Sequence, residues 1–170
     1  GTRPLGFNTC RASEKLLQAS GITVVPADLS EILYAAEAIE DSDTDLLRQM
    51  EKVAGYAEVP ESYREKLCLQ CKFGVAVNRW VEANQVDAVE QNFGCAACVT
   101  MSMLSEAGIP AACETDIAGA VSMLALTLAS KEPSAIADWN NNFAENRNKC
   151  VCTHCGNFPK SFIGNDNLRL

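Results

Sequence analysis

The stretch that decides the fold is IPAACETDIAGAVSMLALTLAS, residues 109–130. Its first part, 109–116, predicts a short strand and a loop, and 118–130 predicts an apolar helix. Two carboxylates, Glu114 and Asp116, stand between them. Charges at this position are either a helix cap, in which an Asp116 oxygen accepts a backbone N–H, or part of a functional site.

Helices and strands alternate through the rest of the chain. Apolar spacing predicts further helices at 13–20, from Asp28 or Ser30 onward, and at 43–57, 60–85 and 96–107. Strands are predicted at 22–29, 86–93, 134–139 and 149–154. This alternation predicts one α/β domain over 1–170, a three-layer α/β/α sandwich with a mostly parallel sheet of the Rossmann-like or flavodoxin-like kind.

Composition narrows the class of protein. With 170 residues, 48% of them hydrophobic, the chain can bury a sizeable core. A net charge of −8 without a basic stripe argues against a nucleic-acid partner, because phosphates need clustered Lys and Arg. The longest apolar run, 117–128, is too short to span a bilayer, and we find no signal peptide, so no membrane partner is expected.

The nine cysteines are an odd number for an oxidised scaffold and indicate a reducing, cytoplasmic compartment. Two C-x-x-C pairs, 68–71 and 95–98, would bind zinc if each lay on a turn. Both pairs fall in predicted helices, which favours buried packing. A redox role for 95–98 at a helix start is the remaining option, because that position lowers the pKa of a thiol.

Polar residues gather where the predicted strands end. Glu90 closes one strand, Glu114 and Asp116 follow another, and Asp138 and His154 close two more. Sites in parallel sheets form beyond these carboxyl ends, so we expect the residues to converge. A lone histidine is more often structural, but His154 with two carboxylates is also a donor set for Mn²⁺ or Mg²⁺.

The loop DWNNNF, residues 138–143, has two interpretations. Asparagine favours surface turns, so a plain turn is one. The other is a sugar-binding rim, in which Trp139 stacks on an apolar sugar face and the Asn and Asp side chains bond hydroxyls. The chain contains no glycine-rich phosphate loop, which disfavours a nucleotide ligand.

Several motifs together carry a family resemblance. GITVVPADLSEI, GIPAACETDIAGAVSMLALTLAS, PSAIADWNNNF and CVCTHCGNFPKSF resemble the L-fucose and L-arabinose isomerase family, especially its shorter fucose isomerase-like branch. The resemblance implies an aldose–ketose isomerase that uses a divalent metal, usually Mn²⁺, and forms oligomers. It also implies a longer protein, of which this chain, lacking an initiator Met, would be the second α/β domain without the C-terminal β domain.

The resemblance also assigns roles to residues. The family's metal ligands fall on Glu90, Asp116 and His154, with Gln91 as the other match for the Glu. The metal would hold two neighbouring oxygens of an open-chain deoxy or pentose sugar and stabilise an enediolate. Glu90 and Asp116 would move the proton between C1 and C2. Glu114 would orient a neighbour, and Trp139 with the Asn140 run would line the sugar pocket.

Two other functions stay open on the sequence. One is a sugar-binding domain that keeps the fold without the chemistry, which the Glu90/Gln91 ambiguity motivates. The other is a zinc-stabilised module built on the C-x-x-C pairs.

Overall fold

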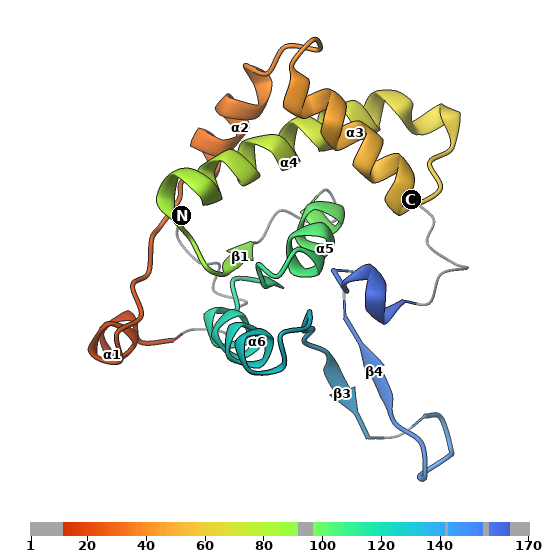
Figure 1. Ribbon diagram of the computed structural model, residues 1–170. Coiled ribbons are helices and arrows are strands. Elements are labelled where there is room, and N and C mark those ends of the chain that lie inside the picture. Colours follow the sequence, from red (N-terminus) through yellow and green to blue (C-terminus); the bar gives the residue numbers. More distant parts are fainter. Residues whose placement is uncertain (1–11, 92–96, 142, 155–156, 164–170) are drawn as a thin grey trace.

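The computed structural model describes residues 12–91, 97–141, 143–154 and 157–163. Figure 1 shows a helical layer, a small central sheet flanked by two helices, and a hairpin that projects from the body. The elements are α1 (Glu14–Ala19), α2 (Leu29–Glu37), α3 (Thr44–Tyr56), η2 (Glu61–Tyr63), α4 (Arg64–Asn84), β1 (Val89–Gln91), α5 (Cys98–Glu106), β2 (Ala111–Cys113), α6 (Ile117–Ser130), β3 (Asp138–Asn140), β4 (Val151–Thr153) and η4 (Lys160–Phe162).

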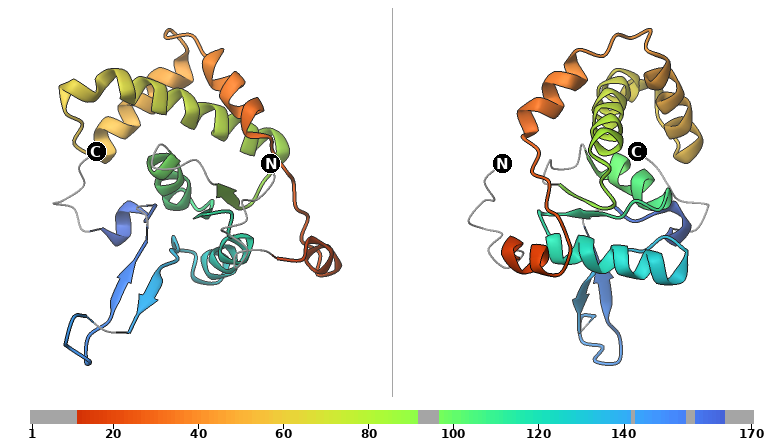
Figure 2. Two further views of the ribbon diagram at one scale, coloured as in Figure 1. Left: turned by 180° about the vertical axis from the view of Figure 1, so that it is seen from behind. Right: turned by 60° about the vertical axis from the view of Figure 1, so that its left-hand side comes forward.

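The helical layer consists of α2 and α3 packed on the long helix α4 (Figure 2). Local signals begin its helices: Asp28 caps α2, and Asp43 caps α3 by accepting from the backbone N–H groups of Asp45 and Leu46 at 2.8 and 3.2 Å. Apolar side chains at helical spacing then pack between the helices of the layer, and Leu46 is fully buried there. The predicted helices at 43–57 and 60–85 are confirmed.

Gly74 lets α4 approach α5 closely. A Cβ at this position would lie 3.0 Å from Thr100 Oγ1 and 3.3 Å from Gln49 Nε2. Because Gly74 has no side chain, α4 packs directly against α5, and the helical layer shares one apolar core with α5 and β2.

The central sheet has two parallel strands, β1 and β2, in the register Val89 to Ala111 and Glu90 to Ala112. Successive residues of a strand point to opposite faces. Ala111 accordingly packs in the core shared with α4 and α5, while Ala112 packs against Met123 of α6. Helices on both faces of a parallel pair confirm the α/β class.

Side chains occupy the outer edge of β2. The N–H of Ala111 donates to Ser105 Oγ at 3.0 Å, and its C=O accepts from Asn157 Nδ2 at 2.8 Å. Ser105 and Asn157 are 1% and 3% exposed. These buried bonds satisfy backbone groups that a neighbouring strand would otherwise pair.

The sheet differs from the prediction in two places. The strand predicted at 22–29 is wrong, because residues 22–28 take no regular structure and Leu29 begins α2. Among the described residues the β-branched run meets no partner strand, and Pro26 cannot donate to a ladder. The last two strands pair antiparallel as a separate hairpin, with Trp139 opposite Cys152. The described strands therefore form two small sheets, and the extended central sheet of a three-layer sandwich stays a prediction.

Among the described residues, no helix combines the length and the apolar character needed to cross a membrane.

Candidate active site

The turn between β2 and α6 has a strained backbone. Glu114 and Thr115 have φ angles of +64° and +59°, a left-handed region that residues other than glycine seldom adopt. For β-branched Thr115 the conformation is costly, and its Oγ1 is buried without a hydrogen-bond partner among the described residues. Strain of this kind concentrates at functional sites, and here it lies at the carboxyl end of a parallel strand.

Asp116 ends this turn and caps α6. Its Oδ1 accepts a hydrogen bond from the N–H of Gly119 at 2.9 Å, so the expected helix cap is confirmed. A Cβ at Gly119 would collide with Asp116 Oδ2 and lie 2.8 Å from Ile136 Cδ1. Only glycine at this position leaves room for the carboxylate.

Glu90 shares a face of the sheet with α6. It pairs with Ala112 in the parallel register, and strand alternation directs both side chains toward the α6 side. Its Oε2 is buried. The carboxylates of Glu90 and Asp116 therefore belong to the same edge and the same face of the sheet. The side chain of Gln91 and the loop 92–96 lie outside the described residues.

His154 directly follows β4. Its ring meets that of Phe158 edge to face, with centroids 6.3 Å apart. Asp138 begins β3 in the hairpin, so the expectation that it would close a strand of the parallel sheet is wrong. The fold thus brings Glu90 and the acidic turn to one edge, while His154 lies on a separate segment beside Phe158, and its approach to that edge stays a prediction.

The donor types suit a hard divalent cation, since carboxylate and imidazole are ligands that Mn²⁺ accepts. Within the described ranges, however, no group of three His, Cys, Asp or Glu side chains is placed so that it could hold a metal ion. The residue types therefore support the predicted ligand set, while the approach of Glu90, Asp116 and His154 to a common metal position stays a prediction.

Trp139 and Asn140 lie on the projecting hairpin, in β3 (Figure 1). Trp139 is 69% exposed, and its Nε1 donates to Asn141 Oδ1. An exposed indole can stack on a sugar, so their role in a sugar pocket stays a prediction. Residue 142 of the same loop lies outside the described residues.

The described cysteines of the C-x-x-C pairs, Cys68, Cys71 and Cys98, lie in helices. Cys71 is 2% exposed in α4, and burial raises the pKa of its thiol to about 11. A thiol that holds its proton at neutral pH behaves as a small apolar side chain, which supports packing at 68–71. Cys98 is the first residue of α5, and Cys95 lies outside the described residues.

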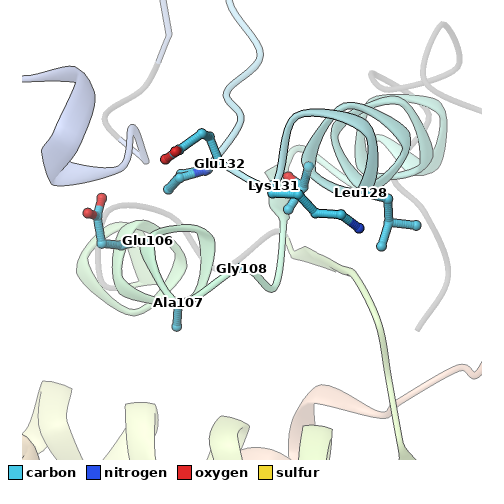
Figure 3. Close-up of a pocket in the computed structure, with 8 residues that line it drawn as sticks. Glu106, Ala107, Gly108, Leu128, Lys131 and Glu132 are labelled. Carbon is cyan, nitrogen blue, oxygen red and sulfur yellow. The ribbon is translucent and has the colours of Figure 1, made fainter.

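A cavity of about 350 Å³ lies between the carboxyl ends of α5 and α6, lined among others by Glu106, Gly108 and Lys131 (Figure 3). Gly108 precedes β2, so this cavity faces the amino end of the strand. It is therefore at the opposite edge of the sheet from the acidic turn.

Sequence reasoning missed Thr115, Gly119 and Asn157. The contact between Asp116 and Gly119 follows the spacing of a helix cap and could have been predicted. Asn157 bonds a residue 46 positions away in the chain, and no local pattern indicates such a partner.

Comparison with known proteins places the chain near sugar isomerases. It is 25% identical over 166 residues to the sulfoquinovose isomerases of Priestia aryabhattai and Priestia megaterium, covering 92% of this chain and 36% of each relative. It is 27% identical over 167 residues to the sulfoquinovose isomerase of a Clostridium species, with the same coverage. The chain thus spans about a third of the length of these relatives.

No protein-family model matches the chain. No solved structure matches it either.

Proposed function

We propose that this chain is the sugar-site domain of a longer aldose–ketose isomerase. The observation that carries the proposal is the similarity to sulfoquinovose isomerases over 92% of the chain. The strained acidic turn at the carboxyl end of β2 supports the proposal, because backbone strain and the carboxyl ends of parallel strands are both typical of active sites.

The chemistry needs a base on one side of a sugar carbon and an acid on the other. An aldose becomes a ketose when a proton is removed from C2 and added to C1, while the carbonyl at C1 becomes a hydroxyl and the hydroxyl at C2 becomes a carbonyl. Glu90 and Asp116 are our candidates for the two carboxylates, since both belong to the α6 side of the sheet. Capping fixes Asp116 in place, and burial of Oε2 limits the freedom of Glu90.

A divalent cation, Mn²⁺ in our proposal, would supply polarisation of the sugar carbonyl when bound. Glu90, Asp116 and His154 would hold it, and Glu114 would orient one of them. The relatives act on sulfoquinovose by their names, so a sulfonated sugar is our first substrate to test, ahead of unsubstituted deoxy sugars and pentoses.

The test uses the full-length protein. We expect Mn²⁺ to support interconversion of sulfoquinovose and its ketose, followed by NMR of the C1 and C2 signals. Quinovose, the same sugar without the sulfonate, controls for the anionic group, and L-fucose and L-arabinose test the other classes. Asp116→Asn and His154→Ala should each remove turnover. Turnover that survives either change would disprove the assigned site.

A sugar-binding domain without catalysis gives a different result. It would bind sugar with an affinity independent of added Mn²⁺ and show no interconversion. Titration calorimetry of the full-length protein with and without metal separates this outcome from the isomerase.

A further inference from the structure

Two exposed cysteines lie close together on the projecting hairpin (Figure 1), and neither has a role in the proposed sugar site. Cys152 is the middle residue of β4, Cys150 directly precedes that strand, and both side chains are free thiols exposed to solvent. Alternate residues of an extended strand point to the same face, so the two side chains emerge together. We call this pair the hairpin dithiol.

The two thiols interact with each other. The pKa of the Cys152 thiol is raised by desolvation, and next by the charge of Cys150 and by a side-chain hydrogen bond between the two groups. A hydrogen bond requires the two sulfur atoms to lie near each other. The alternation of β4 therefore continues through Cys150, and the hairpin dithiol presents its sulfurs as one pair of donors.

Strand geometry favours a metal ion over a disulfide at this pair. Residues two apart on a strand have Cα atoms about 6.6–6.8 Å apart, which is at the upper limit for a disulfide. A disulfide within the hairpin dithiol would therefore bend β4 and disturb its pairing with β3. An ion held between the two sulfurs spans the same gap without this distortion.

The number and the type of the donors select the ion. Thiolates are soft ligands, and monovalent copper and zinc are among the ions that they favour. Structural zinc almost always takes four ligands, and no group of three His, Cys, Asp or Glu side chains in the described part of the chain could hold a metal ion. Monovalent copper accepts two thiolates alone, in linear coordination, so the hairpin dithiol suits copper and not zinc.

We propose that Cys150 and Cys152 together form a binding site for a soft monovalent metal ion of the Cu⁺ type. Each thiol releases its proton to the solvent when its sulfur binds the ion. The ion keeps its oxidation state, so the step needs neither an oxidant nor a reductant. The site uses neither Glu90 nor Asp116, and the proposal does not depend on the proposed isomerase function.

The test titrates the reduced full-length protein with Cu⁺ in the absence of oxygen, against a coloured Cu⁺ chelator as competitor. The dissociation constant should rise by about tenfold or more in Cys150→Ser/Cys152→Ser, because loss of a ligand costs at least as much as loss of a residue that orients one. Cys68→Ala/Cys71→Ala is the matched control. It also removes two closely spaced cysteines, but Cys71 is buried in α4, so the affinity for Cu⁺ should stay unchanged.

Trp139 provides a second readout inside the hairpin. It lies directly opposite Cys152 in the antiparallel register, so the two side chains share a face with Cβ atoms about 4.5–5.5 Å apart. Cu⁺ bound to the hairpin dithiol should therefore quench the fluorescence of this indole. The quenching should persist in Trp80→Phe and disappear in Trp139→Phe.

Four results would overturn the proposal. The first is Cu⁺ affinity that is unchanged in the hairpin variant, and the second is a loss of affinity in the α4 variant alone. The third is Zn²⁺ held through Cys150 and Cys152 as tightly as Cu⁺. The fourth is a disulfide between these two residues in protein purified without reductant, found by mass spectrometry, which would assign the pair to redox chemistry.

Folding and isomerase activity do not decide the outcome. Should the double serine variant fail to fold, Cys150→Ser and Cys152→Ser must each weaken Cu⁺ binding for the proposal to stand. Because sugar turnover is not a readout, failure of the proposed isomerase function leaves this test unchanged.

Discussion

The helical layer and the edge that carries the acidic turn are stabilised in opposite ways. In the helical layer, α2, α3 and α4 bury apolar side chains at helical spacing, and each helix of the pair packed on α4 begins at a local Asp cap. Along β2 and the turn that follows it, the buried side chain of Asn157 bonds the strand backbone from 46 positions away, and two consecutive residues of the turn hold a left-handed conformation. The helical layer is stabilised by burial of apolar side chains, and the region around β2 and the acidic turn depends on individual hydrogen bonds.

The largest expected effect lies in the helical layer. Leu46→Ala should lower the free energy of unfolding by about 2–5 kcal/mol, because it leaves a cavity where the side chain was fully buried. Leu47→Ala is the matched control. The side chain of Leu47, the next residue along α3, is 50% exposed, so its truncation should lower the free energy of unfolding by less than about 1 kcal/mol. Urea unfolding measures both. Equal losses would show that the layer is not held by burial.

Alkaline pH should weaken the same layer. Burial raises the pKa of Cys71 from 9.0 to about 11, so the folded state keeps a proton that the unfolded chain loses. The free energy of unfolding should therefore fall as pH rises from about 9 to about 11, by up to about 2 kcal/mol. Cys71→Ala should flatten this part of the pH profile. An unchanged slope in that variant would assign the effect to other groups.

At the site edge, Asp116 separates capping from chemistry. Asp116→Ala should lower the free energy of unfolding by about 1 kcal/mol, because the N–H of Gly119 loses its acceptor. Asp116→Asn should keep nearly all of that stability, since Asn caps as well as Asp. Both changes should abolish Mn²⁺ binding by the full-length protein, measured by calorimetry. Metal affinity retained in the Asn variant would limit Asp116 to the cap.

The smallest effect is expected at Thr115. Thr115→Gly should raise the free energy of unfolding by about 0.5–1 kcal/mol, because relief of the left-handed strain exceeds the added entropy of the unfolded chain. Thr115→Ala keeps a Cβ at the same φ and should gain less. Thermal unfolding compares the two. Equal stability would show that the backbone of this turn is unstrained.

The two regions also differ in what the sequence reveals. The α3 helix follows from Asp43 and the spacing of Leu46 and Val53, signals that lie within a few residues of one another. The acidic turn was predicted because strand, carboxylates and apolar helix are adjacent in the chain. The run at 22–29 has strand-like composition, but composition cannot reveal that no strand of the described part of the chain pairs with it.

The buried polar bonds to Ala111 could not be predicted from local sequence patterns. Ser105 and Asn157 are ordinary polar residues in the sequence, and only the fold makes them buried partners of Ala111. The position of His154 was predicted as a strand end, yet the sequence could not show that its strand belongs to an antiparallel hairpin. The pairing of strands depends on the whole chain and not on neighbouring residues.

The closed edge of β2 limits how this sheet can grow. Its outward groups are taken by Ser105 and Asn157 at Ala111 and by the N–H of Asp116 at the Cys113 carbonyl. A strand arriving from elsewhere in the protein, or from another subunit, would therefore find the backbone groups of Ala111 already bonded and could not form a regular ladder on this side of β2.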